Sequence, residues 1–188
     1  VVFLGFCLTT ELIEAEVYET TVSDVTTKAF SVVWVSDEAV TEANVRVYSD
    51  SAGLFEITPS IVVSSLDVPF AHDIGIVKID VGGLDATTHY YFHTETSSAS
   101  GTVTQPSDGS LIPVTTAVRV RRANDLDQPI VNDLIHYEAF GLNGVGALPG
   151  SVVFFSVPSI SPYPISSFVG ETGFPIGSTI NDLNNLFD

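Results

Sequence analysis

The sequence predicts an all-β protein: two Greek-key β-sandwiches preceded by an apolar N-terminal strand. Apolar and polar side chains alternate over short stretches rich in Val, Ile, Thr, Tyr and Phe, which is the period of a strand with one buried face. Gly, Pro, Asp and Ser interrupt these stretches at roughly the 8–12-residue spacing that turns have in sandwiches. The hydrophobic content of 45% is sufficient to build a core.

The alternation is clearest in the first 117 residues. The stretches are AFSVVWVSD with Phe30, Val32 and Trp34, ANVRVYSD with Val45 and Val47, DIGIVKIDVGGL with Ile74, Ile76 and Ile79, HYYFHTET with Tyr90, Phe92 and Thr94, and the segment with Ile112 and Val114. Residues 11–18, ELIEAEVY, are compatible with a short helix, because Glu and Ala favour helices, or with a first strand.

Two segments resemble a fibronectin type III domain. SDVTTKAFSVVW is similar to its first two strands with their tryptophan, here Trp34, and GLDATTHYYF is similar to its corner motif, on which Leu84, Thr88 and Tyr90 fall. The resemblance covers about residues 17–117 and implies a β-sandwich in which the Tyr90 hydroxyl bonds upstream backbone. Ala86 stands where the family usually has proline. Residues 54–74 exceed the family's connection and are expected to form an extra strand or a surface loop.

A domain boundary is expected at residues 118–130, where VRVRRAND changes the composition. Residues 131–188 form a second unit, with strands expected in LIHYEAFG and GSVVFFSVP and two short strands in PISSFVGETGFPIGSTI. The pattern of GALPGSVVFF followed by a Ser-Pro stretch is similar to small carboxypeptidase-regulatory-like or surface-protein β-sandwiches. So few strands predict an incomplete sandwich with an unpaired edge and an open groove.

Charge excludes several classes of partner. The net charge is −17 with only six basic residues, which excludes nucleic acid and disfavours an anionic membrane surface. An acidic, lysine-poor surface is typical of a self-repelling, soluble protein, and we expect an extracellular or cell-surface location. No stretch is apolar for long enough to predict a membrane span.

The N-terminal segment, residues 1–16, opens with VVFLGFCLTT and is the candidate for an interface between subunits. Both faces of an extended strand here would be apolar, as in a fully buried strand. Burying its large side chains would contribute on the order of 10 kcal/mol. The interface residues expected to fill the groove of a neighbouring copy are Val1, Val2, Phe3, Leu4, Phe6 and Leu8. The alternatives are packing within the same chain and binding to a membrane.

Signals of catalysis or cofactor binding are weak. His89 and His93 would share a strand face about 13 Å apart, which is too far for one metal ion. Cys7 lies in an apolar run without a nearby base, so a catalytic thiolate is not expected. Oxygen ligands at Asn124, Asp125 and Asp127 are compatible with calcium at the linker, and a solvated acidic linker is the alternative. We predict no catalytic residues, no cofactor and no enzyme activity.

These features together predict a structural protein, the repeating subunit of an extracellular prokaryotic filament or pilus. Copies of the chain are the expected partner, since a donor strand passed from head to tail produces an open polymer. The alternatives are an adhesion or ligand-binding module of a larger surface protein, and a non-catalytic accessory domain of a secreted hydrolase. A filament requires residues 1–8 to be buried by another chain.

Overall fold

The chain folds into antiparallel β-sheets. The computed structural model describes residues 15–65, 70–118, 147–156, 158, 161–170 and 175–176. Within these ranges every regular element is a strand, apart from two single-turn 3₁₀ helices, so the all-β prediction is confirmed there. The strands are β1 (Val17–Ser23), β2 (Ala29–Ser36), β3 (Glu42–Tyr48), β4 (Val62–Ser65), β5 (Ile76–Gly82), β6 (His89–Ser98), β7 (Gly101–Gln105), β8 (Ile112–Thr115), β9 (Val152–Phe155), β10 (Ile165–Val169) and β11 (Pro175–Ile176).

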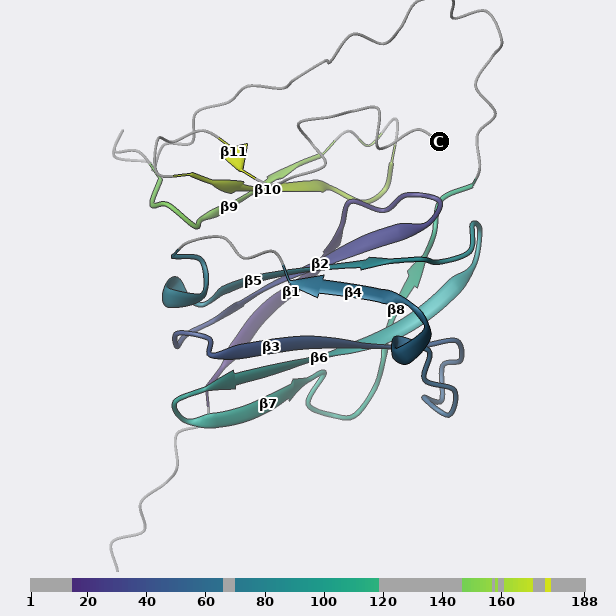
Figure 1. Ribbon diagram of the computed structural model, residues 1–188, viewed down its shortest axis with the longest axis horizontal. Coiled ribbons are helices and arrows are strands. Elements are labelled where there is room, and N and C mark those ends of the chain that lie inside the picture. The colour runs from purple at the N-terminus through teal and green to yellow at the C-terminus, as the bar shows by residue number, and fades with distance from the viewer. Residues whose placement is uncertain are drawn as a thin grey trace, which may run out of the picture.

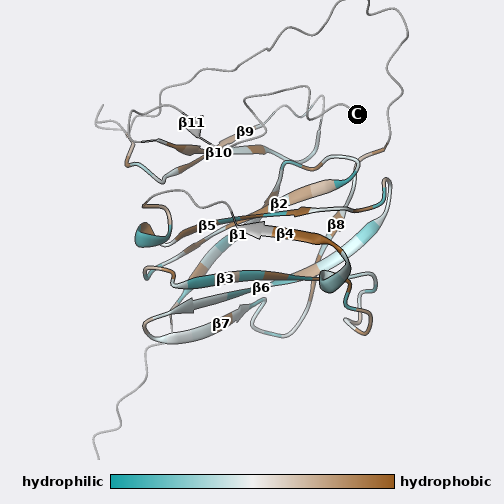
Figure 2. Ribbon diagram, in the orientation of Figure 1, coloured by the Kyte–Doolittle hydropathy of each residue, from teal (hydrophilic) through white to brown (hydrophobic). Residues whose placement is uncertain are grey.

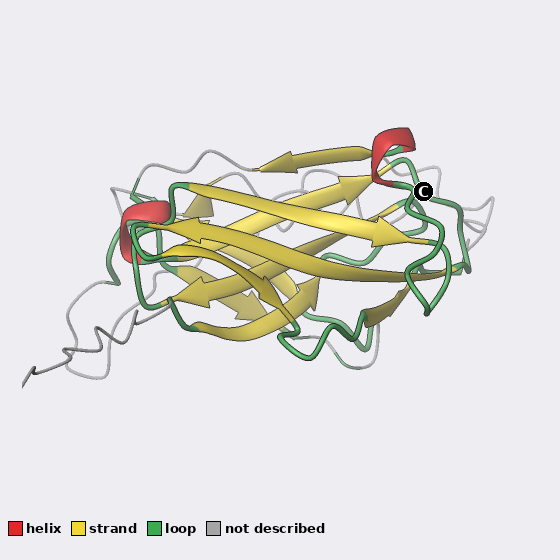
Figure 3. Cartoon of the chain, turned by 90° about the horizontal axis from the view of Figure 1, so that it is seen from below, coloured by secondary structure: helices red, strands yellow, loops and turns green. Residues whose placement is uncertain are grey.

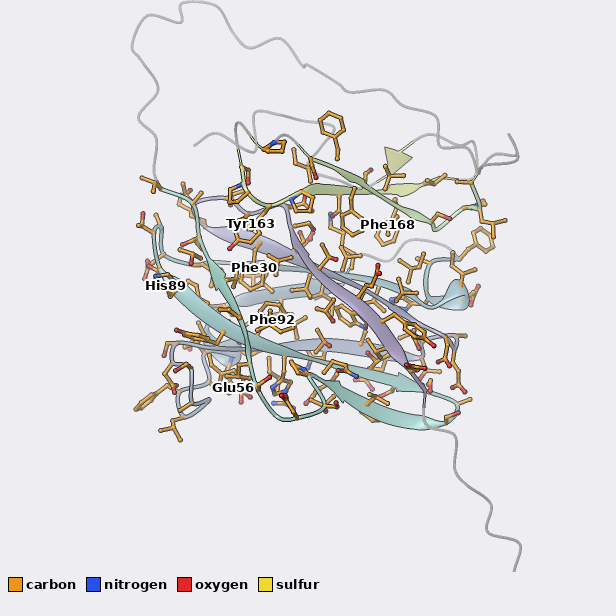
Figure 4. The ribbon with its side chains drawn as sticks, turned by 180° about the vertical axis from the view of Figure 1, so that it is seen from behind. Phe30, Glu56, His89, Phe92, Tyr163 and Phe168 are labelled. Carbon is orange, nitrogen blue, oxygen red and sulfur yellow. The ribbon has the colours of Figure 1, made fainter. Side chains whose placement is uncertain are left out.

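Two sheets face each other across the main core (Figure 1). The middle sheet has the order β1-β2-β5-β4, and the outer sheet has the order β3-β6-β7, with β8 also paired to β6. Phe30 of β2 and Phe92 of β6 meet between them with ring centroids 5.7 Å apart (Figure 4). The other fully buried apolar side chains between the sheets are Val32, Trp34, Val45, Val47, Val77, Ile79, Val81 and Val114.

A third sheet, called here the C-terminal sheet, covers the opposite face of the middle sheet (Figure 1). Its order is β11-β10-β9, and every residue of β10 is buried. Phe168 packs with Ala71 and the half-buried Ile76 in a second, smaller core (Figure 4). The middle sheet is therefore covered on both faces, which explains why Ser31 and Val33 of β2 are as buried as their neighbours Phe30 and Val32.

Hydropathy differs from strand to strand. Apolar residues are prominent on β4 and in parts of β2, whereas β3 and much of β6 are hydrophilic (Figure 2). The two 3₁₀ turns, η1 (Thr58–Ser60) and η2 (His72–Ile74), lie at opposite ends of the strands (Figure 3). Ala71, the residue that caps the start of η2, belongs to the smaller core and packs against Phe168 of the C-terminal sheet.

The segment 54–74 supplies the expected extra strand. Strand β4 pairs with β5 at the edge of the middle sheet, between η1 and η2. For residues 11–18, only the last part is described: β1 begins at Val17, so the strand alternative holds for Val17 and Tyr18. Of the strands expected in residues 131–188, β9, β10 and β11 lie in the expected stretches, whereas LIHYEAFG lies outside the described residues.

The Tyr90 hydroxyl bonds upstream backbone, as expected. It accepts a hydrogen bond from the backbone N–H of Asp85 at 3.0 Å. Tyr90 itself is 5% exposed at the start of β6. This contact bridges the connection between β5 and β6, which lie in different sheets.

Candidate functional site

Two of the sites expected from the sequence fall outside the described residues. The interface residues Val1, Val2, Phe3, Leu4, Phe6 and Leu8 lie there, and so do Cys7 and the linker residues Asn124, Asp125 and Asp127. The predictions made for them stay predictions. The candidate site is therefore built from three features of the described residues: a buried polar cluster, an open sheet edge and a projecting loop.

The buried polar cluster joins the middle sheet to the C-terminal sheet. It consists of Asp24, Lys78, Ser23 and Ser166, and is called here the Asp24 cluster. Lys78 Nζ lies 2.7 Å from Asp24 Oδ2, and both side chains are almost completely buried, with 1% and 2% exposed. Lys78 Nζ also donates to the Ser166 carbonyl at 3.2 Å. One ammonium group thus contacts both layers.

The two carboxylate oxygens of Asp24 have different surroundings. Oδ1 accepts the backbone N–H of Ser166 at 3.0 Å. Oδ2 accepts the Ser166 hydroxyl at 2.6 Å, and the Ser23 hydroxyl lies 3.2 Å away. The Ser23 and Ser166 hydroxyls are themselves 2.8 Å apart. Because each hydroxyl has one proton, Ser166 donates along its shorter bond to Asp24 and accepts from Ser23.

The cluster forms because of strand alternation on the middle sheet. In β5, Val77, Ile79 and Val81 face the main core, which places Lys78 on the face covered by the C-terminal sheet. Asp24 follows β1 directly with a positive φ of 52°, and its N–H donates to the Pro164 carbonyl at 2.9 Å. Burying two charges is costly unless they are paired and hydrogen-bonded, and this pair has both kinds of contact.

This cluster was not predicted from the sequence. The available signal was Lys78 itself, a lysine within the apolar run GIVKIDV in a chain that has only six basic residues. If one face of this strand is assumed to be exposed to solvent, Lys78 is expected to lie on that exposed face.

The open edge belongs to β9. This strand pairs with β10 on one side, and no described strand pairs with its other side. Its sequence is VVFF, without the charge or proline that commonly blocks an exposed edge. Phe154 and Phe155 are 41% and 40% exposed, and nearby Leu148 is 66% exposed. Among the described residues, this edge is thus apolar and has no paired strand.

The projecting loop is the turn after β3, residues 50–56. Leu54 and Phe55 are 76% and 67% exposed at this turn. The Asp50 carboxylate accepts the backbone N–H groups of Ala52, Leu54 and Phe55 at 2.9, 3.2 and 2.7 Å. Desolvation of the Asp50 carboxylate opposes its ionisation, but these backbone donors outweigh it and hold the pKa of Asp50 below its ordinary value.

The two histidines of β6 contact different residues. His89 Nδ1 lies 2.7 Å from the Thr115 hydroxyl, whereas His93 packs against Tyr48 with ring centroids 5.6 Å apart. Both histidines lie on β6, but their neighbours are on different strands. The described part of the chain contains no group of three or more His, Cys, Asp or Glu side chains that could hold a metal ion.

Comparison with known proteins identifies no relative. No family model, curated protein or solved structure matches the chain. None of the helices in the described ranges has the length and hydropathy needed to cross a membrane. Inference about function therefore rests on the residues and their geometry.

Proposed function

We propose that the protein is a structural subunit of an extracellular filament, assembled by strand pairing between copies of the chain. The observation that carries the proposal is the open edge of β9. An apolar edge strand offers backbone N–H and C=O groups to an incoming strand and apolar side chains to pack against it.

The N-terminal segment is the incoming strand. Residues 1–8 are apolar on both faces when extended, so they match an acceptor that supplies apolar contacts around them. Eight extended residues span about 26 Å, which exceeds the length of the four-residue strand β9. When each copy donates one segment and accepts another, the contact is head to tail and does not close.

The second unit would be completed by this contact. In the proposal, the chain comprises a fibronectin III-like sandwich followed by a smaller Greek-key sandwich, of which β9, β10 and β11 are part. A donated strand beside β9 would extend that smaller sheet. The net charge of −17 fits an exposed, soluble surface on such a polymer and supports a location outside the cell.

Electron microscopy of the purified chain tests the proposal. We expect filaments from the full chain and none from a chain lacking residues 1–10. Phe154→Lys adds a charge to the β9 edge and should abolish filaments while the circular dichroism of the monomer is retained. Monodisperse particles from the full chain at all concentrations would contradict filament formation.

A binding module is the second candidate, favoured by the loop 50–56. Leu54 and Phe55 project from a turn that the Asp50 carboxylate holds in place, so little conformational entropy is lost when they bind a partner. Rigid apolar anchors of this kind dominate the binding energy of many interfaces. In this role the chain would act as an adhesion module or as an accessory domain of a secreted hydrolase.

Leu54→Lys separates the two candidates and serves as the matched control for Phe154→Lys. Both variants place a lysine at an exposed apolar position, on the loop and on the edge. Filaments retained in Leu54→Lys and lost in Phe154→Lys would assign assembly to β9. The opposite pattern would assign the contact to the loop.

A further inference from the structure

We propose that Lys78 and Asp24 condense into an intramolecular isopeptide bond, a covalent tie within the middle sheet between the end of β1 and β5, on the face that the C-terminal sheet covers. The proposal does not depend on polymer formation. It starts from the Asp24 cluster, in which a primary amine and a carboxyl group are held together out of water. Lys78 Nζ lies 2.7 Å from Asp24 Oδ2, and neither side chain is more than 2% exposed.

Proximity is the first requirement for the reaction, and the fold supplies it. Asp24 follows β1, whereas Lys78 lies on β5, and they are separated by 54 residues in sequence. Both strands pair with β2 in the middle sheet, and this pairing converts a reaction between two free groups into one within a single rigid site. Such positioning supplies a large part of the barrier reduction in intramolecular reactions.

Burial provides the driving force. An ammonium–carboxylate pair taken out of water keeps a desolvation penalty that its mutual attraction only partly offsets. The amide product is neutral and releases one water molecule. Condensation therefore removes two buried charges from the interface between the sheets.

The hydrogen bonds are arranged as the reaction needs them. Lys78 Nζ first passes a proton to Asp24 Oδ2, which yields a neutral amine and a carboxylic acid. The Nζ lone pair then attacks Asp24 Cγ to form the C–N bond, and charge develops on Oδ1. The backbone N–H of Ser166, 3.0 Å from Oδ1, stabilises that charge.

The remaining oxygen is the leaving group. The C–Oδ2 bond breaks with its electron pair, and Oδ2 departs as water with the proton it already received and a second proton from Nζ. The Ser166 hydroxyl, 2.6 Å from Oδ2, donates a hydrogen bond to this oxygen as it leaves. The Ser23 hydroxyl, 2.8 Å from that of Ser166, donates to the Ser166 oxygen in turn. The product amide keeps one proton on nitrogen, so atoms and charge balance without another reactant.

Intact mass spectrometry of the purified full chain tests the bond. We expect a mass lower than that of the sequence by one water molecule, and a branched peptide joining residues 24 and 78 after proteolysis. Lys78→Arg keeps the positive charge but has no nucleophilic amine, so its mass should equal that of its sequence. A wild-type mass equal to that of the sequence would overturn the proposal.

Two further variants exclude other sources of water loss. A loss that persists in Lys78→Arg would also overturn the proposal, since an aspartyl succinimide forms without lysine. Ser166→Ala should lower the cross-linked fraction in freshly folded protein, whereas Ser167→Ala, at the next position of the same strand, should leave it unchanged. Equal fractions in both serine variants would show that the Ser166 hydroxyl does not assist the leaving oxygen.

Discussion

Trp34 and Thr96 join the two facing sheets by a hydrogen bond through the main core. Trp34 Nε1–H of β2 donates to Thr96 Oγ1 of β6 at 2.8 Å, and both residues are at most 1% exposed. A buried indole N–H without a partner is costly, so this contact lets a large aromatic side chain occupy the centre of the core.

Replacing Thr96 by valine should destabilise the fold. Valine has a similar shape but no acceptor, so the Trp34 N–H would be left buried and unpaired, at a cost of about 1–3 kcal/mol. The free energy of unfolding from urea denaturation measures this loss.

Thr94→Val is the matched control. Thr94 lies on the same strand and is fully buried, but its hydroxyl has no hydrogen-bond partner among the described residues. The same substitution there should be neutral or stabilising, because it removes an unsatisfied polar atom. Equal losses in the two variants would show that the Trp34 contact contributes little.

Lys78→Met should loosen the C-terminal sheet. It leaves the Asp24 carboxylate buried without its cation, which costs about 3–5 kcal/mol. The substitution also removes the amide if the cross-link has formed, so destabilisation is expected in either state. Urea denaturation measures the loss, and limited proteolysis should cut within residues 147–176 before the main core.

The double variant Lys78→Met/Asp24→Asn tests the electrostatic part of this loss. It removes both charges, so it should recover part of the stability lost in Lys78→Met alone. Lys28→Met, at an exposed position, should change the free energy of unfolding by less than about 1 kcal/mol. A double variant no more stable than Lys78→Met would contradict the charge argument.

Strand alternation predicted much of the fold. Phe30, Val32 and Trp34 face the main core as their spacing indicates, and β9, β10 and β11 lie in the stretches expected for them. Alternation succeeds here because it is a local property of a strand that has one apolar face.

The third layer could not be predicted in this way. Ser31 and Lys78 lie on the face of their strands opposite the main core, so the alternation predicts that they face solvent. The C-terminal sheet buries them instead. Whether a polar face is covered depends on where a distant segment docks. Ser166 lies 142 residues from Asp24, so no local pattern relates the two.

Gly150→Ala should disturb the packing of the C-terminal sheet against the segment that contains Ala71. Gly150 has a φ of +84°, and a Cβ there would lie 2.7 Å from the Ala71 backbone nitrogen and 2.8 Å from its Cα. Backbone atoms cannot move aside as a flexible side chain can, so we expect a loss of about 1–3 kcal/mol beyond the backbone strain. Thermal or urea unfolding measures this loss.

Gly109→Ala is the control that separates the steric contact at Gly150 from the strain of a left-handed backbone. Gly109 has a similar φ of +77°, but a Cβ there would meet nothing within 4 Å. Its cost should be limited to the left-handed backbone, about 1–2 kcal/mol. If both alanine variants lose the same stability, the close approach to Ala71 is not a constraint.

The loop 50–56 should loosen in acid through Asp50. Because the pKa of Asp50 is lowered in the folded chain, its contribution is fully present above the ordinary aspartate pKa and is lost as the pH falls through the depressed value. Protonation removes the charge that holds the N–H groups of Leu54 and Phe55. Hydrogen exchange of these amides, corrected for the intrinsic pH dependence of exchange, should therefore accelerate at low pH.

Asp50→Ala should produce the same loosening at neutral pH, since it removes the acceptor altogether. Asp108→Ala is its control: the pKa of Asp108 is also lowered, first by the Ser110 hydroxyl and then by the Ser110 N–H, but that carboxylate serves a different turn. Exchange at Leu54 and Phe55 should respond to Asp50→Ala and not to Asp108→Ala. Amides that remain protected in Asp50→Ala would mean that the carboxylate does not hold the loop, and that the pairing of Ser49 N–H with the Phe55 carbonyl at 3.0 Å is sufficient to hold it.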